Sequence, residues 1–164
     1  MNIQDYKKII DETAIYPSEV SNFGIAYCFL GLIEEIYEFN NTEERHNIIK
    51  EAGDIIWYIT ALSKELDLDY ERIMVSHWED GLSYIGLEIA SFAGNIKKYY
   101  RDGKVIEKEG LTILLEDIIS SIKYSLIMID SSFDEVLTIN YNKLIKRRET
   151  NTIHGDGDNR EEHA

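Results

Sequence analysis

The chain has little of the two residues that most restrict a fold. Among its 164 residues there is one cysteine, Cys28, and one proline, Pro17. A single cysteine excludes an intrachain disulfide and indicates a reducing compartment, which we expect to be the cytoplasm. Because proline interrupts helices, the chain after Pro17 is free to form long ones.

Long apolar runs are missing as well. The start of the chain, MNIQDYKKII, lacks the continuous apolar core of a signal peptide. The longest uncharged apolar stretch, GIAYCFLGLI, has about half the length that a helix needs to span a bilayer. We therefore expect no membrane segment.

Basic residues are scarce: 17 Lys and Arg face 31 Asp and Glu, for a formal net charge of −14. Nucleic-acid binding relies on cations that contact phosphates, so this charge argues against a nucleic-acid partner. A small anionic substrate would also be repelled, unless a metal ion or local cations mediated the contact. Hydrophobic content of 44% and charged content of 29% are typical of a globular protein.

The apolar residues that are present recur at helical spacing. Two stripes advance in steps of four and three: Ile25, Phe29, Leu32 and Ile36, and then Ile48, Ala52, Ile55, Ile59, Leu62 and Leu66. Such steps are typical of amphipathic helices rather than strands. We expect further helices before Pro17 and over residues 69–79, 82–101, 107–130 and 133–148. No segment has the alternation of a strand, so the predicted fold class is all-α.

The chain also resembles itself. Residues 53–74 and 116–137 align without a gap at an offset of 63, which pairs Asp54 with Asp117 and Asp67 with Asp130. We interpret this as a helical bundle of two similar repeats that form an intramolecular pseudo-dimer. The predicted units are residues 1–78, residues 79–148 and a polar tail over residues 149–164. Chance similarity between isoleucine-rich helices is the alternative.

Two pairs of acids interrupt the apolar helices. Glu35 and Glu38 lie three residues apart, as do Glu51 and Asp54, so each pair shares a helix face. If the two helices pack antiparallel, the four carboxylates converge and raise one another's pKa. A divalent cation would relieve that repulsion, and oxygen ligands favour Mg²⁺, with Mn²⁺ as a substitute.

Mg²⁺ held by a few carboxylates usually awaits phosphate oxygens, and this points to metal-assisted hydrolysis of a phosphoanhydride. The alternative is that the acids form only the solvated sides of two amphipathic helices. In the second repeat the matching positions are Glu88, Ser91, Leu114 and Asp117, so that copy is degenerate.

GLIEEIYEF followed by KEAGDIIWYI resembles the signature of the MazG-like, all-α nucleoside triphosphate pyrophosphohydrolases. The segments ETAIYP, NIKKYYRDG, DEVLTINYNKLIKRR and HGDGDNRE resemble further parts of that family, so the resemblance spans nearly the whole chain. It implies hydrolysis of an NTP or dNTP to the monophosphate and pyrophosphate, and it implies a homodimer.

The resemblance also assigns roles to residues. It implies that Glu35, Glu38, Glu51 and Asp54 bind Mg²⁺ and carry the catalysis. The candidate substrate-binding residues are Tyr58, Lys97, Lys98, Arg101, Asn140, Lys143, Arg147 and Arg160. Asn140 and Lys143 belong to the second repeat, and His77 and Asp80 stand at the matching positions of the first. We therefore expect the second repeat to lend phosphate contacts to the first.

Two alternatives stay open. One is a related all-α hydrolase, of the dUTPase-like or phosphoribosyl-ATP type, with the same metal chemistry and a different base or ribose pocket. The other is a helical scaffold or regulatory protein that has lost catalysis, which the degenerate second repeat makes credible. A scaffold would tolerate the loss of Glu38 or Asp54, whereas an enzyme would lose metal binding and turnover.

Overall fold

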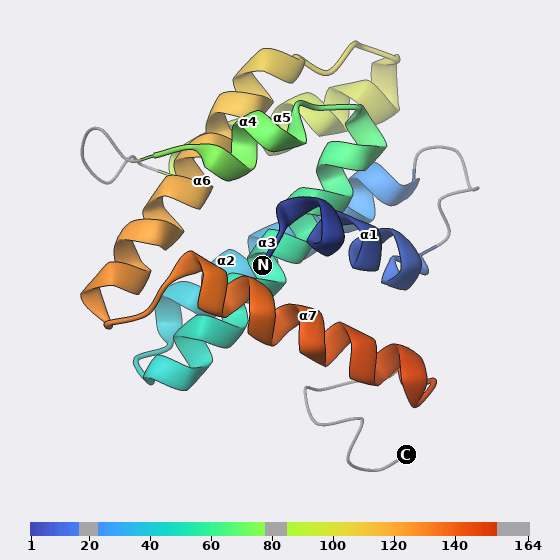
Figure 1. Ribbon diagram of the computed structural model, residues 1–164. Helices are drawn as coiled ribbons and strands as arrows, with labels where there is room; N and C mark the ends of the chain where they lie inside the picture. The colour runs from blue at the N-terminus through green and yellow to red at the C-terminus, as the bar shows by residue number, and fades with distance from the viewer. Residues whose placement is uncertain (17–22, 78–84, 154–164) are drawn as a thin grey trace.

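The computed structural model describes residues 1–16, 23–77 and 85–153, and within them every regular element is an α-helix (Figure 1). This confirms the predicted all-α class. The helices are α1 (Ile3–Thr13), α2 (Phe23–Asn41), α3 (Arg45–Leu66), α4 (Tyr70–Val75), α5 (Ile85–Asp102), α6 (Lys108–Met128) and α7 (Phe133–Glu149).

Helix α3 runs through the centre of the bundle, with α2 behind it and α1 and α7 in front in Figure 1. It also contacts α4 and α6. Buried side chains occur on nearly every side of α3, as expected of a core helix. The predicted stripe from Ala52 to Leu66 is buried, but its first member, Ile48, is only half-buried and Ile49 takes the core position.

The predicted helix over residues 69–79 is too long, because α4 ends at Val75 and Ser76 has extended backbone. A contact with α6 ends the helix. Lys123 Nζ donates to the carbonyl oxygens of Met74 and Ser76, at 2.8 and 2.7 Å, and Ser76 Oγ donates to the carbonyl oxygen of Glu116 at 3.1 Å. The last carbonyls of α4 are therefore satisfied from outside the helix.

The two halves of the chain interlock. Helix α7 packs against α3, and α4 packs against α6 in the reciprocal way. Asp67 and Asp130, which follow α3 and α6, both adopt the left-handed conformation, with φ of 51° and 53°. Side chains from residues 1–78 and 79–148 contribute to one buried core.

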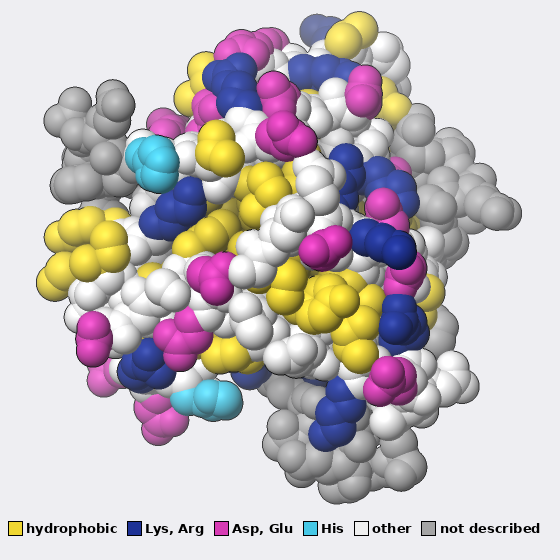
Figure 2. Space-filling model, viewed as in Figure 1, with side chains coloured by type: hydrophobic (Ala, Val, Ile, Leu, Met, Phe, Trp, Pro, Cys, Tyr) yellow, Lys and Arg dark blue, Asp and Glu magenta, His cyan; other side chains and the backbone are white. Residues whose placement is uncertain are grey.

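Acidic and basic side chains are interspersed over the face shown in Figure 2, with hydrophobic side chains exposed between them. That face carries no broad basic surface of the kind that nucleic-acid binding uses. Among the described residues, no helix is both long enough and apolar enough to cross a bilayer.

We predict that Leu32→Ala lowers the free energy of unfolding by about 2–5 kcal/mol, because it leaves a cavity where the side chain is fully buried. Ile127, on α6, is 71% exposed and provides the control. Ile127→Ala should change the free energy by no more than about 0.5 kcal/mol. Urea denaturation measures both, and equal losses would contradict the position of α2.

Candidate functional site

Three of the four predicted acids meet where α2 packs on α3. One carboxylate oxygen from each of Glu35, Glu38 and Glu51 lies within 4.8 Å of the other two. Glu51 is buried at 6% exposure, Glu35 is half-buried and Glu38 is exposed, so the group opens to solvent on one side. Lys50 Nζ forms an ion pair with Glu51 Oε1 at 3.0 Å. We call these three glutamates the acidic cluster.

The fourth acid, Asp54, is held by the last helix. Asn140 Nδ2 donates a hydrogen bond of 3.0 Å to Asp54 Oδ1, and Lys143 Nζ forms an ion pair with the same oxygen. The side chains of Asp54 and Lys143 are mostly buried, with 20% and 14% exposure. Asn140 is 2% exposed. The structure thus brings Asn140 and Lys143 to the first set of acids, across more than 80 residues of sequence.

Crowding among the acids shows in the pKa of Glu35, which rises to about 8. Burial is the largest cause, followed by the charges of Asp54, Glu51 and Glu38, while Lys143 acts in the opposite direction. At neutral pH and without a metal ion, Glu35 therefore retains its proton. All four predicted acids lie close enough to influence one another.

Tyr58 lies one turn beyond Asp54, against the helix that carries the glutamates. A Cβ atom at Gly31 would lie 2.2 Å from ring atoms of Tyr58, so only glycine permits this approach. Burial raises the pKa of Tyr58, as do contacts with Tyr27 and the charges of Glu35 and Asp54. Its hydroxyl therefore stays protonated beside the acids, and Trp57 packs edge-on against its ring at 4.8 Å between centroids.

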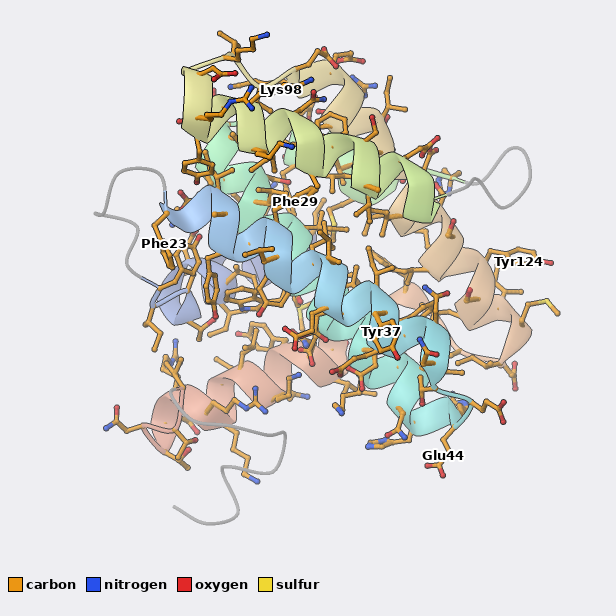
Figure 3. All side chains as sticks on the ribbon, turned by 180° about the vertical axis from the view of Figure 1, so that it is seen from behind. Phe23, Phe29, Tyr37, Glu44, Lys98 and Tyr124 are labelled. Atoms are coloured by element: carbon orange, nitrogen blue, oxygen red, sulfur yellow. The ribbon has the colours of Figure 1, made fainter. Side chains whose placement is uncertain are left out.

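The predicted basic residues of α5 do not meet the acidic cluster within the chain. Figure 3 places Lys98 at the top of the view, well away from Tyr37, the neighbour of Glu38. The end of α5 instead lies near the start of α2, where the backbone N–H of Ala26 donates to Tyr100 Oη at 3.2 Å. Ala26 precedes Glu35 by nine residues, or roughly 13 Å of helix.

The other candidate cations of α5 and α7 are placed as follows. Lys97 and Arg101 are exposed, and Arg101 pairs with Asp102 at 2.7 Å. Arg147 is buried in α7, at 8% exposure. Arg160 lies outside the described residues, as do Pro17, Trp78, Asp80 and the tail segment HGDGDNRE.

No role was predicted for Tyr6 from the sequence, yet its side chain reaches the site from α1. Its side chain is fully buried, and its hydroxyl donates to Asn140 Oδ1 at 2.8 Å. A signal existed, because Tyr6 shares the buried face of α1 with Ile9 and Ile10. A buried tyrosine hydroxyl needs a hydrogen-bond partner.

The described part of the second half carries no comparable group. Glu88 and Ser91 are exposed, Leu114 is buried and Asp117 is half-buried. Among the described residues, Glu35, Glu38 and Glu51 form the one group of at least three Asp, Glu, His or Cys close enough to share a metal ion. The difference between the two predicted repeats therefore extends to their geometry.

The donors suit a hard divalent cation. They are oxygens alone, one of them nearly buried, and burial together with the nearby acidic charges raises the pKa of Glu35 when no cation is present. Mg²⁺ and Mn²⁺ prefer such oxygen ligands, and the open side would leave room for waters. The donor set therefore fits a hard divalent cation.

Comparison with known proteins adds one likeness. The chain is 29% identical over 85 residues to the Gene 37 protein of Mycobacterium phage L5, an alignment that covers 42% of this chain and 75% of that protein. The name of that protein states no activity. No protein-family model and no solved structure matches the chain.

We predict that the metal-free protein loses stability as the pH rises from about 5 to about 9. In the unfolded chain Glu35 returns to its ordinary pKa and is ionised in this pH range, whereas in the folded protein it keeps its proton. The folded state therefore binds one more proton than the unfolded state, and raising the pH favours unfolding. Glu35→Gln should flatten the dependence of melting temperature on pH. The exposed neighbour Glu34, changed to Gln, is the control and should keep the wild-type slope. If Glu35→Gln kept the wild-type dependence of melting temperature on pH, the raised pKa of Glu35 would be contradicted.

Proposed function

We propose that the protein is a Mg²⁺-dependent nucleotide pyrophosphohydrolase of the MazG-like kind, which converts an NTP or dNTP to the monophosphate and pyrophosphate. The observation that carries the proposal is the acidic cluster together with Asp54, placed between α2 and α3 and closed by α7. It combines crowded carboxylates on one side with an amide and an ammonium group on the other. A metal–triphosphate complex needs both kinds of group.

In this proposal Glu35, Glu38, Glu51 and Asp54 would hold the ion. Mg²⁺, with Mn²⁺ as a substitute, would supply positive charge that offsets the phosphate charges and lowers the pKa of nearby water. Glu35 is our candidate to accept a proton from the attacking water, because its side chain is half-buried and lies among the other three acids. Water oxygen bonds to the α-phosphorus, the bond from that phosphorus to the bridging oxygen breaks, and pyrophosphate leaves.

The residues of α7 would serve the phosphates. Lys143 Nζ lies at Asp54 Oδ1, and from there it would face a phosphate oxygen of a substrate bound through the cation. Tyr58 offers a protonated hydroxyl one turn away. Lys97, Lys98 and Arg101 point to no such role within one chain, and they would need a second chain to reach a substrate.

We further propose that the fold is a tandem repeat with a degenerate second copy, with units at residues 1–78 and 79–148. Two observations support this. The left-handed residues Asp67 and Asp130 occupy matching positions, and α7 packs on α3 as α4 packs on α6. The second unit then completes the site of the first, since Asn140 and Lys143 come from it.

A homodimer in the cytoplasm is part of the same proposal. Figure 3 looks onto α2, which lies across the near side of the molecule. Its outward face carries four exposed apolar side chains, Phe23, Tyr27, Leu30 and Tyr37, and the helix has no Lys or Arg. A second copy of the chain is the occupant that we expect on this face, because burying such a stripe is favourable and its own copy is always present.

The second candidate function is a helical scaffold without catalysis. It is favoured by the fact that the site is already balanced without a metal: Lys143 neutralises Asp54, and Glu35 keeps its proton. A scaffold would keep its fold and its affinity for a partner when Glu38 is replaced.

We expect a panel of NTPs and dNTPs with Mg²⁺ to yield monophosphate and pyrophosphate from some members. Glu38→Gln should lower kcat/KM by at least about 100-fold, because it removes charge from the metal site, while Glu34→Gln should keep wild-type activity. Separation of all phosphate products measures this. No turnover by folded wild-type protein that binds Mn²⁺ would favour the scaffold.

The same assay tests the assignment to the first unit. The double variant Glu88→Ala with Asp117→Ala should keep its activity. If that variant were inactive in an intact fold while Glu35→Ala was active, the catalytic unit would be the second one.

The dimer makes a separate prediction. Leu30→Glu together with Tyr37→Glu should convert a dimer to monomers, because the changes place charges in the buried stripe. Ile127→Glu changes a side chain that is 71% exposed on α6 and should leave the dimer intact. Light scattering after size-exclusion chromatography measures the mass, and a monomeric wild type would contradict the homodimer.

A further inference from the structure

A hydrogen-bonded chain links α1 to the acid on α3 through α7. Tyr6 Oη donates to Asn140 Oδ1 at 2.8 Å, and Asn140 Nδ2 donates to Asp54 Oδ1 at 3.0 Å. Tyr6 and Asn140 are 0% and 2% exposed, so solvent cannot substitute readily for either bond. The three residues come from three helices, and the amide of Asn140 is the middle member.

The order of the chain follows from which atoms can donate. A carboxylate only accepts, so the amide nitrogen of Asn140 must face Asp54 and its oxygen must face away. In the opposite orientation the amide oxygen would face the carboxylate oxygen, and the two oxygens would repel each other. The hydroxyl of Tyr6 donates to the amide oxygen of Asn140. This hydrogen bond favours the amide orientation in which the nitrogen of Asn140 faces Asp54.

Close packing fixes the middle member as well. A Cβ atom at Gly53 would lie 2.7 Å from Asn140 Nδ2 and 2.9 Å from its Cβ, so Asn140 lies directly on the backbone of α3. The Tyr6 hydroxyl also lies 3.4 Å from the carbonyl oxygen of Gly53. Both side chains therefore pack against the backbone of α3 at Gly53.

We propose that Tyr6 is a positioning residue for Asp54, acting through the side-chain amide of Asn140. Asn140 and Lys143 both bind Oδ1 of Asp54, and we assign its other oxygen to the divalent cation. This inference rests on the proposed function, since it takes Asp54 as part of a metal site. Tyr6 itself touches neither a cation nor a substrate.

The test is the affinity for Mn²⁺, measured by electron paramagnetic resonance of the free ion on the full chain. Tyr6→Phe should weaken binding by about tenfold, as the loss of an outer-shell hydrogen bond does in metal sites. Tyr70→Phe is the matched control, because Tyr70 is also buried, at 4% exposure, and its hydroxyl donates to the carbonyl oxygen of Ile3 at 3.2 Å. It should leave the affinity unchanged.

A double-mutant cycle separates positioning from general stability. In an Asn140→Ala background, adding Tyr6→Phe should weaken Mn²⁺ binding by less than about twofold, because the connecting amide is gone. Independent tenfold losses would overturn the proposal, as would wild-type affinity in folded Tyr6→Phe. Wild type that binds Mn²⁺ but hydrolyses no nucleotide would overturn the proposed function and leave this inference standing. Wild type that binds no Mn²⁺ would overturn both.

Discussion

The structure depends on one conflict: α3 is buried on nearly every side, yet it carries Glu51 and Asp54. Ionised carboxylates are costly to bury unless opposite charge or hydrogen bonds compensate. The fold compensates them from different directions. Lys50 pairs with Glu51, and Asn140 and Lys143 bind Asp54. Glu35 receives less help and keeps a proton instead. Helix α7 is therefore held against α3 by these polar contacts as well as by apolar packing.

Much of the fold could be predicted from apolar spacing alone. Ile25, Phe29 and Leu32 lie in the core, as does the stripe from Ala52 to Leu66, because a residue that recurs every three to four positions must face one side of a helix. The end of α4 could not be predicted. It is set by Lys123, almost 50 residues further on, which binds the carbonyls of Met74 and Ser76. Local sequence does not contain that contact.

The site was predictable to the extent that it is local. Spacing alone placed Glu35 with Glu38 and Glu51 with Asp54, and packing of neighbouring helices did the rest. Asn140 and Lys143 could be assigned only through resemblance to a family, since a contact across the length of the chain leaves no periodic signal. The basic run on α5 shows the opposite failure. Lys98 does lie on a helix, as its sequence pattern predicts. That pattern does not indicate where in the bundle the helix packs, and Lys98 lies far from the acidic cluster.

The position of α7 has a consequence for how the molecule is assembled. Asp54 obtains its partners from residues 86 and 89 positions later in the chain. Helices form within about a microsecond, but contacts of this sequence separation require closure of a long loop, which is slow by comparison. During synthesis at the ribosome, α2 and α3 can therefore pair early while Asp54 stays uncompensated. The docking of α7 completes the helical bundle and also brings Asn140 and Lys143 to Asp54. The fold and the candidate site are therefore completed in the same step.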